Sequence, residues 1–193
     1  KKIIDTYIIP RLLYGLESLF ITTKQKELLD GFLRDLLKKV QALPQRTANE
    51  APYLLLNTNT AEGMLDIRLL TFFGKVISDN TSILHQVCLR QLATKSLGSN
   101  SWFVSITRLA YKYDLPSPHI FLQMSMKQTT WKKMVKKRIT QYWFNKLQTS
   151  AADKSTLRRM HKETPTWTHV PLNTHAVARA RLQTSLIDRK SVV

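Results

Sequence analysis

Apolar side chains recur at spacings of three and four residues through most of this 193-residue chain, which is the period of an α-helix. No segment shows a convincing alternation of period two, so we predict an all-α fold, an irregular bundle of about eight helices with no sheet. The clearest helix begins at a capping box, Thr22-x-x-Gln25, and is expected to end at Pro44. Its apolar stripe comprises Leu28, Leu29, Phe32, Leu33, Leu36, Leu37 and Val40.

The first apolar segment, residues 7–17, has the helical period but contains two residues that disfavour a helix. Pro10 lacks a backbone N–H and its ring collides with the carbonyl four residues earlier, while Gly15 costs about 1 kcal/mol relative to alanine. Such residues persist where the backbone must bend or approach another segment closely. We expect Pro10, Tyr14 and Gly15 to form a structural motif, and the plainer interpretation is a kinked, buried first helix.

The turn-rich sequence at 97–101 marks the clearest internal boundary. It coincides with a shift in charge, since residues 1–100 carry 13 basic and 9 acidic side chains, whereas residues 101–193 carry 17 basic and 4 acidic. We therefore predict a helical subdomain at 1–97 and a basic helical subdomain at 98–193. The formal net charge of +17 favours a polyanionic partner, nucleic acid before an anionic membrane surface.

Residues able to carry catalysis are sparse. Polymerase and nuclease chemistry needs paired carboxylates that hold divalent metals about 4 Å apart. No two aspartates are adjacent, and the acids Glu17, Glu50, Glu62 and Asp66 are scattered in sequence. No glycine-rich phosphate loop is present either. We expect no catalytic residue, no cofactor and no metal in this chain.

Cys88 is the only cysteine, so no disulfide can form within the chain, and a reducing compartment, nucleus and cytoplasm, is expected. His85 and Cys88 share one face of a helix at metal-ligand spacing, but a structural zinc site needs four ligands. A buried cysteine beside a histidine at the rim is the favoured interpretation. No run is long and apolar enough to span a membrane, so no membrane partner is expected.

The strongest functional signal is the helix expected at about 130–147. Its apolar side chains fall on one face, and we expect Trp131 and Trp143 to be core residues rather than platforms that stack bases. The other sides carry basic groups that can neutralise phosphates and release counterions, although a solvated face is the plainer interpretation. The predicted nucleic-acid-binding residues are Lys132, Lys133, Lys136, Lys137 and Arg138, with Arg158 and Arg159 further along the chain.

Several segments, in order, resemble the region just downstream of the polymerase palm in reverse transcriptases of non-LTR (LINE-type) retrotransposons. The pattern Ile-x-Pro-x-Leu-x-Tyr-Gly-x-Glu at 8–17 is followed by Leu43-Pro44-x-x-Thr47, which adds Pro44 to the structural motif. The likeness continues through the segments 51–56, 66–70, 111–118, 131–133, 142–143 and 167–170, and so covers nearly the whole chain.

This resemblance implies a thumb-like first hairpin, a linker-like second part, and a palm upstream in the same polyprotein, an RNA-directed DNA polymerase. The chain begins with Lys1 inside an apolar segment and is expected to be a fragment of that polyprotein. The expected function is non-catalytic, namely to hold template RNA and primer DNA by their phosphates.

Two other hypotheses remain. The chain is alternatively a helical protein-interaction or structural module, including a degenerate transposon remnant without binding activity. An independent DNA-binding regulator would need a helix-turn-helix, which the turn at 97–101 and its flanking helices match poorly.

Overall fold

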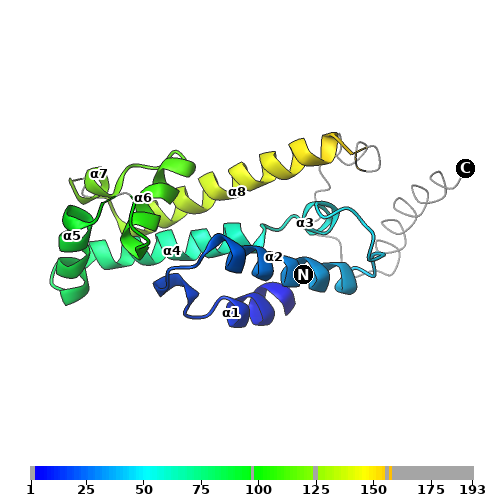
Figure 1. The fold of residues 1–193 in the computed structure, drawn as a ribbon, viewed down its shortest axis with the longest axis horizontal. Helices are drawn as coiled ribbons and strands as arrows, with labels where there is room; N and C mark the ends of the chain where they lie inside the picture. Colours follow the sequence, from blue (N-terminus) through cyan, green and yellow to red (C-terminus); the bar gives the residue numbers. More distant parts are fainter. Residues whose placement is uncertain (1–2, 97, 124–125, 155–156, 158–193) are drawn as a thin grey trace, which may run out of the picture. The chain divides into compact units, whose positions relative to one another are not determined.

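The computed structural model describes residues 3–96, 98–123, 126–154 and 157, and these residues form eight α-helices and no strand (Figure 1). The predicted all-α fold class is therefore confirmed. A π-helical turn, η1 (Ile4–Ile8), and a 3₁₀ turn, η2 (Leu16–Ser18), flank the first α-helix. The α-helices are α1 (Ile9–Leu12), α2 (Thr23–Val40), α3 (Ala51–Leu56), α4 (Ala61–Ser78), α5 (Ile83–Thr94), α6 (Trp102–Lys112), α7 (Pro118–Gln123) and α8 (Gln128–Ala152).

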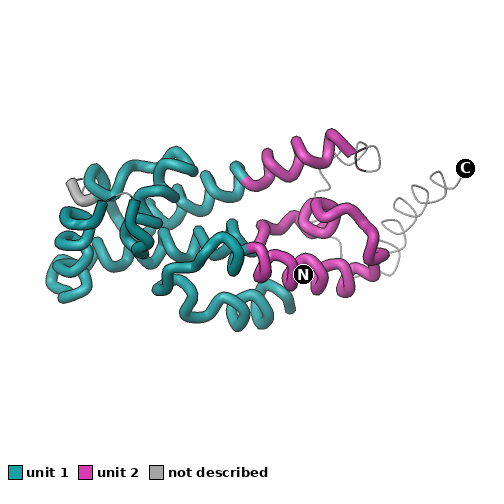
Figure 2. Tube along the Cα trace, viewed as in Figure 1, with its two compact units in different colours: residues 1–26, 61–142 teal, residues 27–60, 143–193 magenta. Residues whose placement is uncertain are grey.

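The chain divides into two compact units, each made of two sequence segments (Figure 2). Unit 1 consists of residues 1–26 and 61–142, and unit 2 consists of residues 27–60 and 143–193. Helices α2 and α8 each contribute residues to both units. The subdomains expected at 1–97 and 98–193 are a different division of the chain, and they stay a prediction.

The N-terminal segment departs from a regular helix at both predicted positions. Pro10 follows the π-helical turn η1, in which the Ile9 N–H bonds to the carbonyl of Ile4, and this wider turn gives the proline ring room. Gly15 has a φ of 75°, in the left-handed region, and a Cβ added there would meet no atom within 4 Å. The backbone conformation, rather than a close approach, is therefore what requires glycine here.

Burial of this first segment is only partial. Ile4 and Leu13 are buried, but Tyr7 and Tyr14 are exposed to solvent. The interpretation as a buried first helix is therefore wrong for the tyrosine side of the segment.

The core of unit 1 contains a close contact between α4 and α8. The indole N–H of Trp131 donates a hydrogen bond to the carbonyl of Leu70 at 2.8 Å. The same indole packs against Phe73 and Phe121, with ring centroids 6.4 and 4.3 Å away. Gly74 lies where the indole crosses α4, so closely that a Cβ at this position would collide with the ring.

Both ends of α2 can be explained from local interactions. The predicted capping box is confirmed, because the Thr22 N–H donates to Gln25 Oε1 at 2.9 Å and the Gln25 N–H donates to Thr22 Oγ1 at 3.4 Å. The helix ends before Pro44, contrary to expectation, because Ala42 takes a left-handed φ of 50° and the Leu43 N–H closes back onto the last turn.

The apolar faces of α2 and α5 are partly exposed. Leu33 and Leu37 of α2 and Cys88 of α5 are buried as expected. A periodic apolar face shows that a helix is amphipathic but does not show what covers it, and here the cover is incomplete. The exposed members are Leu28, Phe32 and Val40 of α2 and Ile83, Leu84 and Val87 of α5.

Glu50 links two distant segments of unit 2. Helix α3 begins at Ala51, and the side chain of Glu50 does not cap it. Its carboxylate instead accepts hydrogen bonds from Ser150 Oγ at 2.8 Å and from Lys154 Nζ at 2.7 Å. Next to this contact lies a small apolar cluster of Ala51, Leu54, Ala151 and Leu157.

Helix α8 continues to Ala152, beyond the end predicted near residue 147. The polar residues Thr149 and Ser150 disfavour a helix only weakly. Burial of Ala151, with Phe144 and Leu147 packed against the same cluster, supplies the tertiary contact that overrides them.

We expect Gly74→Ala to lower the free energy of unfolding by about 1–3 kcal/mol, the usual cost of overpacking, although alanine is the better helix former. Urea denaturation followed by circular dichroism measures the change. Gly31→Ala on α2 is the control, because its Cβ would meet only Arg34 Nη2 at 3.8 Å. Alanine at Gly31 should be neutral or stabilising, and equal losses in the two variants would contradict the packing argument.

Stability should also depend on pH through Glu50. Burial raises the pKa of Glu50, but hydrogen bonds from Lys154 and Ser150 outweigh it and hold the pKa below its ordinary value of 4.5. A carboxyl group with a lowered pKa in the folded state stabilises the protein above its unfolded pKa, and this contribution disappears as the pH falls through the folded pKa.

Glu50→Gln should therefore have a lower Tm than the wild type at pH 7, and the difference should shrink below about pH 4.5. Thermal denaturation from pH 7 to pH 3 measures both curves. Glu27→Gln, at an exposed position of α2, is the control and should follow the wild type. A difference that stayed constant across the whole range would show that the ionised carboxylate is not the cause.

Candidate nucleic-acid interface

Helix α8 separates apolar from basic side chains. Trp131, Val135 and Ile139 are buried in unit 1, with no more than 1% of each exposed. Because the helix has 3.6 residues per turn, turning these positions inward places the residues between them on the other sides. All five predicted basic residues of the helix are accordingly exposed: Lys132, Lys133, Lys136, Lys137 and Arg138.

Four of these residues form a continuous surface, which we call the four-lysine band (Lys132, Lys133, Lys136 and Lys137). Lys132 and Lys136 lie one helical turn apart, and Lys133 and Lys137 form a second row beside them. Neighbours in one row are about 5–6 Å apart at Cβ. Positive charge is therefore concentrated along about two turns of one helix.

Arg138 is separated from the band. One hundred degrees of rotation per residue places it on the opposite flank of α8, and its Nη1 lies 3.2 Å from Oδ2 of Asp114. The band itself has no such counterion. Within the described part of the chain, no carboxylate forms an ion pair with any of its four lysines.

The large aromatic residues of α8 serve packing, as predicted. Trp131 is 1% and Trp143 is 6% exposed, and the Lys146 ammonium lies 4.7 Å from the centroid of the Trp143 ring. Tyr142 is half-buried and meets the ring of Tyr113 edge to face at 5.0 Å. Neither tryptophan has a free ring face on which a base could stack.

The other predicted residues have separate roles. Arg158 and Arg159 lie outside the described residues. Pro10 and Gly15 shape the backbone of the first segment, and the carbonyl of Pro44 accepts the Thr47 N–H at 3.0 Å in the turn after α2. Pro10, Gly15 and Pro44 therefore act on the local backbone.

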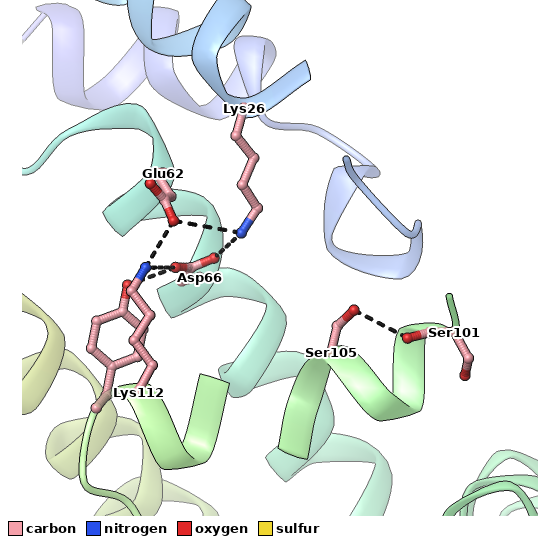
Figure 3. Close-up of polar contacts among 7 residues, drawn as sticks. Lys26, Glu62, Asp66, Ser101, Ser105 and Lys112 are labelled. Atoms are coloured by element: carbon pink, nitrogen blue, oxygen red, sulfur yellow. Dashed lines mark hydrogen bonds and ion pairs between the residues drawn. The ribbon is translucent and has the colours of Figure 1, made fainter. Parts of the chain in front are cut away.

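A charge cluster in unit 1, which we call the buried charge cluster after its fully buried member Asp66, was not anticipated from the sequence; its other charged side chains are 18–29% exposed. It comprises Lys26, Glu62, Asp66, Lys112 and Tyr113, and Figure 3 shows the two lysines converging on the two carboxylates. The fully buried carboxylate of Asp66 accepts hydrogen bonds from Tyr113 Oη at 2.6 Å and Lys26 Nζ at 2.8 Å. Lys112 Nζ lies 2.8 Å from Glu62 Oε1 and 3.6 Å from Asp66 Oδ2.

The contacts of this cluster hold α2, α4 and α6 together. Its two carboxylates face two ammonium groups, so the charges cancel, and the donors come from the first turn of α2 and the end of α6. A sequence signal did exist, because Glu62 and Asp66 lie one turn apart on a mostly apolar helix and such a like-charged pair needs cations. Among the described residues, no group of three or more His, Cys, Asp or Glu could hold a metal.

Among the described residues, His85 and Cys88 belong to no group of three or more side chains that could hold a metal. Cys88 is fully buried, and burial raises the pKa of its thiol to about 11. His85 Nδ1 lies 3.1 Å from the carbonyl of Ile77. The interpretation as a buried cysteine beside a half-buried histidine is confirmed.

The described helices include none whose length and hydropathy would suit a membrane crossing. Comparison of the chain with protein-family models, with curated proteins and with solved structures finds no match. Its function must therefore be argued from its own residues.

The buried charge cluster can be tested by removing its cations. Lys26→Met together with Lys112→Met should lower the free energy of unfolding by about 3 kcal/mol, because Asp66 would then be a buried carboxylate without a counterion. Asp66→Asn on that background should recover much of the loss, since an amide keeps the shape without the charge. Urea denaturation of the three proteins measures both steps, and a triple variant no more stable than the double variant would contradict the explanation.

Proposed function

We propose that this chain binds the phosphate backbone of nucleic acid through the four-lysine band on α8. The observation that carries the proposal is that four neighbouring, exposed lysines have no carboxylate partner among the described residues, while Lys26, Lys112 and Lys154 each have one. Solubility alone gives no reason for acids to be absent from this one surface of the helix.

Binding to such a surface does not depend on the base sequence of the nucleic acid. Each lysine that neutralises a phosphate releases a condensed counterion, and the logarithm of the binding constant then falls with the logarithm of salt concentration by about 0.9 per phosphate on duplex DNA. Four contacts correspond to a slope of about −3.6. The lysine ammonium groups act as point charges that position the protein on the phosphate backbone, and they do not read the bases directly.

In the wider proposal the chain is a non-catalytic C-terminal segment of a retrotransposon reverse transcriptase. It holds template RNA and primer DNA while a palm encoded upstream in the same polyprotein carries out polymerisation. Support for this part comes from the ordered likeness of sequence segments, from 8–17 to 167–170. The strongly basic second half agrees with a polyanionic ligand.

A second candidate function, a protein-interaction module, has one specific observation in its favour. The exposed apolar side of α5 includes Ile83, 77% exposed, and Leu84, 57% exposed. Exposed apolar groups of this kind often mark contacts with another protein. The two functions differ in their ligand, and the next experiment separates them.

The test is a fluorescence-anisotropy titration of the full chain with a labelled RNA–DNA primer–template across a salt series. The wild type should bind with a strong salt dependence. Replacing all four lysines of the band by alanine should reduce the magnitude of the slope by about 3–4, because the contacts to phosphates are lost.

The control variant removes the same charge from other exposed positions, namely Lys24, Lys39, Lys75 and Lys95. It should retain most of the wild-type slope. If the folded wild type does not bind at low salt, or if both quadruple variants lose the slope equally, the four-lysine band is not the binding surface. If the folded wild type does not bind at all, the interaction module is the better description.

A further inference from the structure

Tyr111 is the most exposed large apolar side chain among the described residues, at 90%. It lies in the last turn of α6, while its neighbours Ala110 and Tyr113 are buried. Its hydroxyl has no hydrogen-bond partner within the described part of the chain. Tyr111 therefore contributes its ring neither to the core nor to the buried charge cluster.

The backbone around Tyr111 is fixed against α8. The Tyr111 carbonyl accepts the Asp114 N–H at 3.3 Å, and Asp114 reaches Arg138 of α8 through its carboxylate. Tyr113 meets Tyr142 of α8 edge to face and is anchored by Asp66. These contacts hold the end of α6 beside the Arg138 flank of α8, with the Tyr111 ring facing solvent.

We propose that Tyr111 is a base-stacking platform beside Arg138, on the flank of α8 opposite the four-lysine band, and that the ligand it takes is an unpaired nucleotide of single-stranded RNA or DNA whose phosphates lie on the band. This inference rests on the proposed function, and it adds a second kind of contact to it. An aromatic ring stacks on any base, because every base has a π-face, so the contact selects strandedness rather than sequence. In a continuous duplex the base faces are already stacked on each other and are closed to Tyr111.

The ion pair beside Tyr111 suits a surface that meets phosphates. Arg138 and Asp114 are 51% and 88% exposed at their side chains, and ion pairs between such exposed groups contribute little stability. The guanidinium can exchange Asp114 for a phosphate oxygen, with which it forms strong charge-assisted hydrogen bonds. A strand on the lysine side of α8 would then be held by its phosphates, while a base at the α6 side stacks on Tyr111.

The experiment compares two ligands across the same salt series: a labelled single-stranded oligonucleotide and the blunt duplex formed from it. Tyr111→Ala should weaken binding of the single strand roughly 5- to 150-fold, the range measured for loss of one base stack, without changing the salt slope. Binding of the blunt duplex should stay unchanged. Tyr111→Phe should restore single-strand binding, since it keeps the ring and loses only the hydroxyl.

Tyr14→Ala is the matched control, because Tyr14 is a second tyrosine of unit 1 that is 84% exposed and lies in the turn between α1 and η2. It should bind both ligands as the wild type does. The inference is overturned if Tyr111→Ala binds the single strand normally, or if it weakens single strand and duplex equally.

Failure of this inference can be told apart from failure of the proposed function. If the wild type binds with a slope that depends on the four-lysine band while Tyr111→Ala has no effect, only the stacking platform is wrong. If the wild type shows no salt-dependent binding to either ligand, the proposed function and the stacking platform are both wrong.

Discussion

The buried carboxylate of Asp66 is the constraint on which the arrangement of unit 1 depends. A charge with no solvent exposure must be matched by cations and hydrogen-bond donors, and Asp66 obtains them from Lys26 of α2 and from Lys112 and Tyr113 at the end of α6. Satisfying one aspartate on α4 therefore fixes two other segments against it. Apolar contacts alone are less directional and would allow several neighbouring registers.

The orientation of α8 follows from the same region. Tyr113, which is held by Asp66, packs against Tyr142 of α8. The indole of Trp131 on α8 donates a hydrogen bond to the Leu70 carbonyl and lies against Gly74. Together these contacts fix the rotation of α8 about its own axis. Once these aromatic positions point inward, the helical period leaves no other place for the four-lysine band than the surface. The polar surface of α8 is thus set by its buried face.

These dependencies explain which features could be predicted from the sequence. The capping box at Thr22 and the two-sided nature of α8 are local consequences of residue order, and both were predicted correctly. The partners of Asp66 and Glu50 were missed because each lies 40 or more residues away in the chain, and no local pattern encodes such a pairing. The exposure of the apolar side of α5 was not predicted, because an apolar period shows which side of a helix is apolar but not whether another element covers it.

Lysine occurs in two opposite electrostatic environments in this chain, and net charge alone cannot distinguish them. Lys26 and Lys112 are held by Glu62 and Asp66 in a cluster whose charges cancel, so beyond a few ångströms they add little to the field that a ligand meets. The lysines of the band have no acid beside them among the described residues, and like charges one turn apart on a helix repel each other. An arrangement that is unfavourable in the free protein becomes favourable when a polyanion lies across it. The cost of keeping four ammonium groups together therefore supports the proposal that this surface binds phosphates.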